Sequence, residues 1–150
     1  MRKIVIAISL LASIGIPETQ AAIPSQTECV ARTVYWEARG TSERSMLAVA
    51  QVVVNRTRHH KWPRNACEVV YQRAGSVCQF SWVCGSRRHR RPSDRDPEWM
   101  RAMYIASLAI HGVPDVTNGA LYFHSSQISP GWRNLRRVAM VGGNTFYTER

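Results

Sequence analysis

Four cysteines constrain the fold of this chain more than any other feature. They are Cys29, Cys67, Cys78 and Cys84, and the sequence contains no others. An even number of cysteines in an exported chain indicates two disulfide bonds, for which three pairings exist. We favour Cys78–Cys84 together with Cys29–Cys67. The alternative is a zinc site built from all four thiolates, although no two of them have the C-x2-C spacing typical of such sites.

The first residues of the chain bear on this choice, because disulfides persist outside the cytoplasm. Met1-Arg2-Lys3 is basic, residues 4–16 form an apolar run, and Thr19-Gln20-Ala21 supplies the small residues that a signal peptidase recognises. This pattern predicts a signal peptide over residues 1–21 and one mature domain over residues 22–150. An uncleaved membrane anchor is the alternative, but it needs about 20 apolar residues. We expect an exported protein, located either in the periplasm or outside the cell, at the cell wall.

The chain is strongly basic, with 20 Lys and Arg residues against 10 Asp and Glu and a formal net charge of +10. An exported basic protein attracts polyanions such as peptidoglycan, lipopolysaccharide, teichoic acids or extracellular nucleic acid, and charge alone does not choose among them. The segment 85–95, GSRRHRRPSDR, contains five arginines and no large apolar residue. We expect it to be a solvated loop. The candidates for contact with anionic envelope polymers are Arg87, Arg88, Arg90 and Arg91.

Start signals and apolar periodicity predict three main helices and a short one. The expected helices span about residues 26–40, 42–57 and 96–111, with the short one over 65–72. Capping boxes mark the starts of the first helix and the short one, and an N-cap followed by proline marks the start of the last. The helix over 42–57 is predicted from its wide apolar face, and glycines are placed to end the first and the last main helix. Glu37 falls on the apolar stripe of the first helix.

The remaining segments have β-type patterns. Residues 77–84, VCQFSWVC, alternate so that Gln79 and Ser81 fall on one face, which predicts a strand or a hairpin arm. The other predicted strands are residues 120–124, 138–141 and 145–147, the last two as a hairpin around Gly142-Gly143-Asn144. We therefore expect an α+β domain in which three main helices pack beside a small antiparallel sheet.

Glu37, in the stretch YWEARG, is the strongest candidate for a catalytic group. It falls in the last turn of its helix, where the negative end of the helix dipole disfavours a carboxylate. Burial beside Tyr35 and Trp36 also disfavours the charged form. Both effects raise the pKa, as a general acid requires. The alternative is an ordinary surface ion pair with Arg39 or Arg44.

Other catalytic groups have weaker support. Among the remaining mature carboxylates, Glu43 and Asp115 alone are free of capping, loop or tail positions, so they are the candidates for a second acid. Glycoside hydrolysis normally uses two carboxylates, but one suffices when a hydroxyl of the sugar itself attacks the anomeric carbon. The five histidines include no H-E-x-x-H pattern, and no G-x-S-x-G pattern is present. We expect no metal and no cofactor.

Six stretches in a fixed order carry a resemblance to a known family. They are YWEARG, MLAVAQVVVNRTR, CEVVYQ, CQFSWVC, GALYFHSSQISPGW and VGGNTFY, between Cys29 and Tyr147. In this order the chain resembles the SleB/CwlJ-type cell wall hydrolases, the spore-cortex-lytic enzymes and their relatives. Many relatives read E-A-R-G-E, whereas this chain has Thr41 at the last position, which we expect to be dispensable or to act as a helix cap.

The resemblance implies a lysozyme-related helical part beside a small β-sheet, with a cleft between them. It places the catalytic glutamate on Glu37, and it places the segments Cys78–Ser81 and Ala120–His124 along the cleft. The substrate-binding candidates are Tyr35, Gln79, Ser81, Tyr122 and His124, and aromatic rings among them suit the faces of sugars.

The resulting hypothesis is an exported, monomeric glycosidase of the muramidase or lytic transglycosylase type, which acts on peptidoglycan and not on nucleic acid. Two alternatives stay open. One is a zinc-dependent amidase that cuts the bond between muramic acid and the stem peptide. The other is a basic peptidoglycan-binding protein without enzymatic activity.

Overall fold

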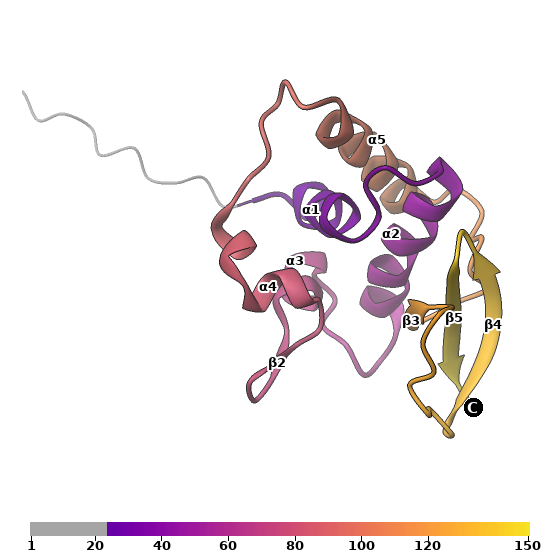
Figure 1. Cartoon of the computed structure of the whole chain (residues 1–150). Coiled ribbons are helices and arrows are strands. Elements are labelled where there is room, and N and C mark those ends of the chain that lie inside the picture. The colour runs from indigo at the N-terminus through magenta and orange to yellow at the C-terminus, as the bar shows by residue number, and fades with distance from the viewer. Residues whose placement is uncertain (1–23) are drawn as a thin grey trace, which may run out of the picture.

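The computed structural model describes residues 24–150, and the predicted signal peptide over residues 1–21 lies outside this range. The fold is α+β, as the sequence predicts, with helices on one side and an antiparallel sheet on the other (Figure 1). The helices are α1 (Gln26–Ala38), α2 (Glu43–Arg58), α3 (Ala66–Tyr71), α4 (Ser81–Cys84), the short 3-10 helix η1 (Ser86–His89) and α5 (Pro97–His111). The strands are β1 (Arg73–Ala74), β2 (Val77–Cys78), β3 (Tyr122–Ser125), β4 (Leu135–Val141) and β5 (Asn144–Glu149). None of the helices in this part of the chain has the length and apolar content that a membrane crossing requires.

The main helices begin at the predicted signals. The Ser25 hydroxyl accepts a hydrogen bond from the backbone N–H of Glu28 at 3.1 Å, and the Asp96 carboxylate accepts one from Glu98 at 2.9 Å. Helix α5 ends at Gly112, whose φ of 92° lies in a region that glycine occupies at little cost. Capping depends on neighbouring residues alone, which is why these helix ends follow from the sequence.

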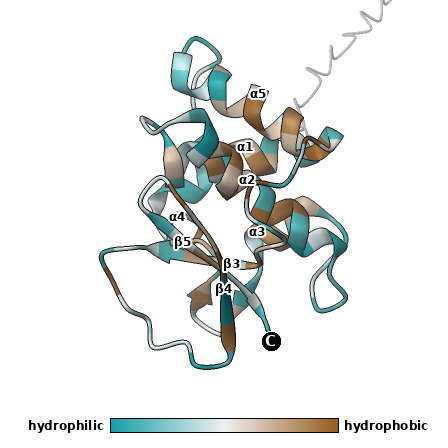
Figure 2. Ribbon diagram, turned by 90° about the vertical axis from the view of Figure 1, so that its right-hand side faces the viewer, coloured by the Kyte–Doolittle hydropathy of each residue, from teal (hydrophilic) through white to brown (hydrophobic). Residues whose placement is uncertain are grey.

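Helix α2 supplies both halves of the core. Its residues Met46 and Val49 are fully buried in the cluster that joins α1, α3 and α5. Its residues Ala48 and Val52 are fully buried against Phe146 of the sheet. A helix that is apolar on two sides lies between two layers, and Figure 2 shows apolar stretches on the helices that surround it.

The sheet has the strand order β3-β5-β4 and is antiparallel throughout. Its two longer strands, β4 and β5, form the predicted hairpin, with Gly142 and Gly143 in the turn at φ values of 55° and 80°. Two consecutive positive φ values are the requirement of a tight two-residue hairpin turn. Gly142 also packs against α2, because a Cβ at this position would lie 1.7 Å from the Ser45 hydroxyl oxygen.

The predicted strand over residues 77–84 is wrong. Only Val77–Cys78 is extended, and the chain then turns into α4. The reason is the disulfide between Cys78 and Cys84, whose Cα atoms are 5.8 Å apart. Six residues of extended strand span roughly 20 Å, so a strand and this disulfide exclude each other.

Residues 85–95 are solvated as predicted, since all but the half-buried Arg88 and Pro92 are exposed, but the segment is not a plain loop. The segment begins with η1, and three of its arginines pack on aromatic rings. The guanidinium of Arg87 lies 5.3 Å from the centre of the Trp36 ring, and that of Arg91 lies 5.4 Å from the centre of the Trp99 ring. Guanidinium groups are attracted to ring faces, which composition alone does not reveal.

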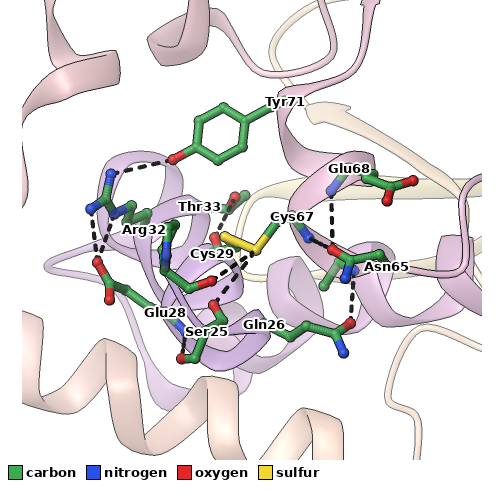
Figure 3. The surroundings of a disulfide bond; sticks show 12 residues. Ser25, Gln26, Glu28, Cys29, Arg32, Thr33, Asn65, Cys67, Glu68 and Tyr71 are labelled. Carbon is green, nitrogen blue, oxygen red and sulfur yellow. Dashed lines mark hydrogen bonds and ion pairs between the residues drawn. A yellow bond between two sulfur atoms is a disulfide. The ribbon is translucent and has the colours of Figure 1, made fainter. Parts of the chain in front are cut away.

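Both predicted disulfides are confirmed. Cys29–Cys67 joins α1 to α3, and Figure 3 shows the polar contacts around it. The backbone N–H of Ala66 donates to the Gln26 side chain at 2.9 Å, which fixes the start of α3 to the start of α1. Cys78–Cys84 closes the turn that carries Gln79 and Ser81.

Candidate functional site

A cleft of about 500 Å³ lies where the end of α1, the start of α4 and strand β3 meet. It brings together five of the six predicted site residues, which come from distant parts of the chain: Glu37, Gln79, Ser81, Tyr122 and His124. The rest of its lining is Arg56, Phe80, Phe123, Ser125, Ile128, Trp132 and Asn144. The lining therefore combines one carboxylate, one guanidinium, amides, hydroxyls and aromatic rings.

Glu37 lies in the last turn of α1 and is half-buried at the edge of the cleft. Burial raises the pKa of its carboxyl above the usual 4.5, and the positive charge of Arg87 partly opposes this effect. Within residues 24–150 it forms no ion pair, so the surface pairing with Arg39 or Arg44 does not occur. A carboxyl that is partly desolvated but reachable from a cleft is suited to donate a proton.

No second carboxylate lines this cleft among the described residues. Glu43 is exposed and lies 3.6 Å from Arg101. The Asp115 carboxylate accepts hydrogen bonds from the backbone of Thr117 and Gly119, at 2.8 and 2.7 Å, and so holds a turn. Of the two candidates for a second acid, Glu43 is therefore a surface residue and Asp115 has a structural role.

Strand β3 and the loop after it form an aromatic wall. Trp132 is 38 % exposed, and its ring centre lies 6.0 Å from that of Tyr122 and 5.4 Å from that of His124. The His124 ring also stacks on Tyr147 at 5.2 Å. Exposed indole faces of this kind suit the apolar faces of sugar rings.

Both nitrogens of the His124 ring are used within the protein. Nδ1 lies 2.7 Å from the carbonyl oxygen of Ser125, which can only accept, so Nδ1 carries the proton. In the neutral ring, Nε2 then accepts from the Tyr147 hydroxyl at 3.0 Å. His124 thus contributes a fixed ring to the wall rather than a free base.

The opposite wall is the turn between β2 and α4. Gln79 and Ser81 are both exposed toward the cleft, while Phe80 and Trp82 between and beside them are buried. The predicted proximity of Gln79 and Ser81 thus arises from a disulfide-closed turn and not from strand alternation.

Arg56 is the residue that the sequence interpretation missed. It is 4 % exposed, and its Nε donates to the carbonyl oxygen of Leu121 at 2.7 Å. Its guanidinium lies 5.6 to 5.7 Å from the ring centres of Trp62, Phe80 and Tyr122. Burial lowers its pKa to about 10, so it stays charged near neutrality.

One donor of this guanidinium is buried and unpaired among the described residues. The Nη1 atom of Arg56 has no hydrogen-bond partner within the described residues, and Arg56 lines the cleft. A buried donor without a partner is costly unless a ligand or water satisfies it. The signal in the sequence was available, because Arg56 continues the inward-facing stripe of Val49 and Val52 on a helix that is otherwise apolar there.

Two further predictions come out differently. Tyr35 does not line the cleft: it is 7 % exposed, and its hydroxyl donates to the Asp96 carboxylate at 2.6 Å on the side facing α5.

Thr41 does not cap the next helix, because Ser42 does so. The Thr41 hydroxyl instead donates to the carbonyl oxygen of Ala38 at 2.6 Å and closes the end of α1.

The side chains that commonly bind metals are dispersed in the described part of the chain. Among residues 24–150, no three His, Cys, Asp or Glu side chains lie close enough together to hold a metal ion. All four cysteines are in disulfides.

Comparison with known proteins assigns the chain to a family. A model of the family described as "Cell Wall Hydrolase" matches residues 40–147, most of the chain. The chain belongs to this family. The match of this cell wall hydrolase begins at residue 40, so Glu37 precedes it and its role depends on the geometry of the cleft.

Two solved structures share the fold of this cell wall hydrolase. The catalytic domain of the Bacillus cereus SleB protein has 22% sequence identity and a TM-score of 0.66, over 82% of this chain and 89% of that chain. The catalytic domain of SleB from Bacillus anthracis, described as a germination-specific lytic transglycosylase, has 22% identity and a TM-score of 0.68, over 85% of this chain and 98% of that chain. No curated protein sequence matches the chain significantly.

Proposed function

We propose that this cell wall hydrolase is a glycosidase that cuts the glycan strands of peptidoglycan between N-acetylmuramic acid and N-acetylglucosamine. Glu37 is the general acid and then the general base. The observation that carries the proposal is that Glu37 is the one carboxylate lining the cleft within the described residues, and that its burial favours the protonated form. The fold shared with a lytic transglycosylase domain supports it.

A single carboxyl completes the reaction when the sugar supplies the nucleophile. The Glu37 carboxyl gives its proton to the oxygen that links the two sugars, and the bond from that oxygen to the anomeric carbon of muramic acid breaks. A hydroxyl of the same muramic acid then bonds to the anomeric carbon and returns its proton to the Glu37 carboxylate. The products are an anhydro-muramic end and a new N-acetylglucosamine end, and no water is consumed.

The other lining residues hold the substrate. Gln79 and Ser81 present an amide and a hydroxyl on the wall next to Glu37. Trp132, Tyr122 and His124 present ring faces to the cleft, and Arg56 contributes a positive charge to its lining. Polar groups that converge in a partly apolar cleft orient a ligand in this way.

The same proposal includes export to the cell envelope. Two disulfides are stable in an oxidising compartment, and peptidoglycan lies there. The net charge of +10 favours binding to an anionic wall.

The decisive experiment compares Glu37→Gln with wild type on purified sacculi. The amide keeps the shape of the side chain but acts neither as an acid nor as a base near neutral pH, so muropeptide release falls by about 100-fold or more. Glu43→Gln is the matched control, because Glu43 is exposed and outside the cleft. Release by Glu37→Gln at the wild-type rate refutes the mechanism.

Mass spectrometry of the fragments identifies the bond and the product. Anhydro-muramic ends are expected. Reducing ends show that water is the nucleophile, as in a muramidase. Free stem peptides, with activity lost in EDTA, show a zinc amidase and refute the proposed reaction. Binding to sacculi without any fragment shows a protein that is not an enzyme.

A further inference from the structure

A second pocket, which we call the arginine pocket, has in its lining Trp36, the residue directly before Glu37. Its volume is about 420 Å³, and four guanidinium groups line it: Arg39, Arg87, Arg90 and Arg91. The guanidiniums of Arg39 and Arg87 lie 5.1 and 5.3 Å from the centre of the Trp36 ring. Nothing in the proposed reaction uses this pocket.

The arginine pocket carries more positive charge than the protein itself neutralises, because Asp96 is the one carboxylate in its lining. Arg39, Arg87 and Arg90 form no ion pair with any described residue. One carboxylate is in the lining, that of Asp96, and it already accepts from the Tyr35 hydroxyl at 2.6 Å and from a backbone N–H. Three guanidinium groups are therefore free to bind an anion.

The segment that supplies most of these arginines is held in place. Arg91 pairs with Asp94 at 2.7 Å and with Glu28 of α1 at 3.3 Å. Asp94 in turn accepts from the indole N–H of Trp99 on α5 at 3.2 Å. Arg91 thus anchors the segment to two helices, and a pocket whose walls are fixed before binding loses less entropy on binding.

The position of the arginine pocket indicates its ligand. Trp36 precedes Glu37 in the chain, and the charge of Arg87 acts on the Glu37 carboxyl, so the pocket and the cleft are neighbours. In peptidoglycan, the stem peptide branches from the muramic acid whose bond is cut, and the peptide carries free carboxylates. Guanidinium groups bind carboxylates through paired, charge-assisted hydrogen bonds.

We propose that the arginine pocket binds a carboxylate of the stem peptide while the glycan strand lies in the Glu37 cleft. This proposal rests on the proposed function, because the substrate in both cases is peptidoglycan. It makes the enzyme selective for muramic acid that bears a charged peptide.

The test uses the double variant Arg39→Gln/Arg90→Gln, which keeps Arg87 and therefore the charge next to Glu37. Its control is Arg136→Gln/Arg137→Gln, which removes the same charge from exposed positions on β4 outside both pockets. Three substrates are compared: glycan strands with their peptides, the same strands with the peptide carboxylates amidated, and stripped strands. The stripped strands have lost their peptides to an amidase, and the lactyl carboxylates that the amidase exposes have then been amidated. The readout is kcat/KM on each, with circular dichroism melts to show that all proteins are folded.

Wild type prefers the peptide-bearing strands. The Arg39/Arg90 variant loses about tenfold or more on these strands, the range expected for charge-assisted hydrogen bonds, and is unchanged on amidated and stripped strands. The control variant keeps the wild-type preference. Arg39→Lys/Arg90→Lys, which keeps the charge but not the paired donors, falls between wild type and the glutamine variant.

Three outcomes overturn the proposal. An equal loss in the control variant shows attraction by net charge alone. An equal loss on stripped strands shows an effect on the cleft or on folding. An unchanged rate on all substrates shows that the arginines do not contact the peptide. Failure of the proposed function is recognised separately, because it appears as activity of Glu37→Gln or as fragments cut at another bond.

Discussion

At the level of single residues, the burial that prepares Glu37 for acid catalysis also reduces the stability of the folded protein. Its folded-state pKa is raised above 4.5 by desolvation, so the unfolded chain ionises first as pH rises. Stability from this group is fully present below pH 4.5 and is lost as pH rises through the folded-state pKa. Glu37→Gln removes this loss. We therefore expect the variant to have a higher Tm than wild type at pH 8 and the same Tm as wild type at pH 4. A lower Tm of the variant at pH 8 contradicts burial as the cause.

Arg87 sets the pH at which the acid loses its proton. Its positive charge lowers the pKa of Glu37 against the larger effect of burial. Arg87→Gln therefore raises this pKa, and the alkaline limb of the pH–rate profile moves to higher pH. The measurement is kcat/KM against pH on the stripped strands with amidated lactyl groups, which carry no carboxylate for the arginine pocket to bind.

Arg88→Gln is the control for this shift. Arg88 belongs to the same segment and stacks on Tyr71 at 6.0 Å, but its charge does not contribute to the raised pKa of Glu37. We expect its alkaline limb to coincide with that of wild type. A shift of equal size in both variants would show that net charge, not proximity, controls the profile.

Local signals made Glu37 a candidate for the cleft: its place on a helix stripe, its helix end and its aromatic neighbours. They left a surface ion pair equally open, and the six ordered motifs of the family resemblance favoured the cleft position, which the structure shows. The sequence interpretation wrongly placed Tyr35 in the cleft. Tyr35 and Glu37 are two positions apart on a helix, so their side chains point to different sides. The helix stripe of α2 marks Arg56 as a buried charge, but only the tertiary packing of α2 and of the β-hairpin places Arg56 and Asn144 in the same cleft as Glu37.

At the level of elements, the β4–β5 hairpin turn is also a contact with α2. Gly142→Ala places a methyl group against the Ser45 side chain, which is buried and hydrogen-bonded to Ser42 at the start of α2. We expect a loss of about 2 to 4 kcal/mol in the free energy of unfolding, from the strained backbone and the overlap together. Urea unfolding followed by circular dichroism measures it.

Gly143→Ala separates the two causes. Gly143 has a similar positive φ of 80°, but no atom lies within 4 Å of a Cβ built on it. We expect about 1 to 2 kcal/mol for the backbone conformation alone. Equal losses in the two variants would show that the contact with Ser45 contributes nothing.

The segment 77–84 shows why periodicity alone failed at this scale. Its alternation of polar and apolar residues is typical of a strand, yet the sequence also contains Cys78 and Cys84, which pair. The distance limits of a disulfide exclude an extended chain between them, so the pairing and the strand could not both hold. A covalent constraint between near neighbours outweighs the weak preference of eight residues for a strand.

At the level of the whole molecule, α2 determines how the two walls of the cleft face each other. It packs against α1, which carries Glu37, and against the sheet, which carries Tyr122 and His124. Arg56 near its end bonds to the backbone of Leu121, directly before β3. The apolar pattern of α2 predicted a central helix. The relative orientation of the two cleft walls depends on long-range tertiary contacts, which cannot be identified from the sequence pattern.

The two disulfides contribute differently to this arrangement. We expect removal of one to reduce mainly the stability of the fold, and removal of the other to reduce mainly the activity. Cys29–Cys67 closes a sequence separation of 38 residues and Cys78–Cys84 one of 6. The loop-entropy relation gives about 4 kcal/mol for the first and about 2 kcal/mol for the second. We expect Cys29→Ala/Cys67→Ala to lower the free energy of unfolding more, as measured by urea unfolding.

Cys78→Ala/Cys84→Ala has the smaller effect on stability and the larger effect on activity per folded molecule. The reason is that this disulfide closes the turn that presents Gln79 and Ser81 to the cleft, whereas Cys29–Cys67 lies among helices away from it. Muropeptide release at 25 °C, corrected for the folded fraction, is the measurement. If the Cys29/Cys67 variant loses more activity per folded molecule, the turn does not depend on its disulfide, and its geometry must come from the burial of Phe80 and Trp82 alone.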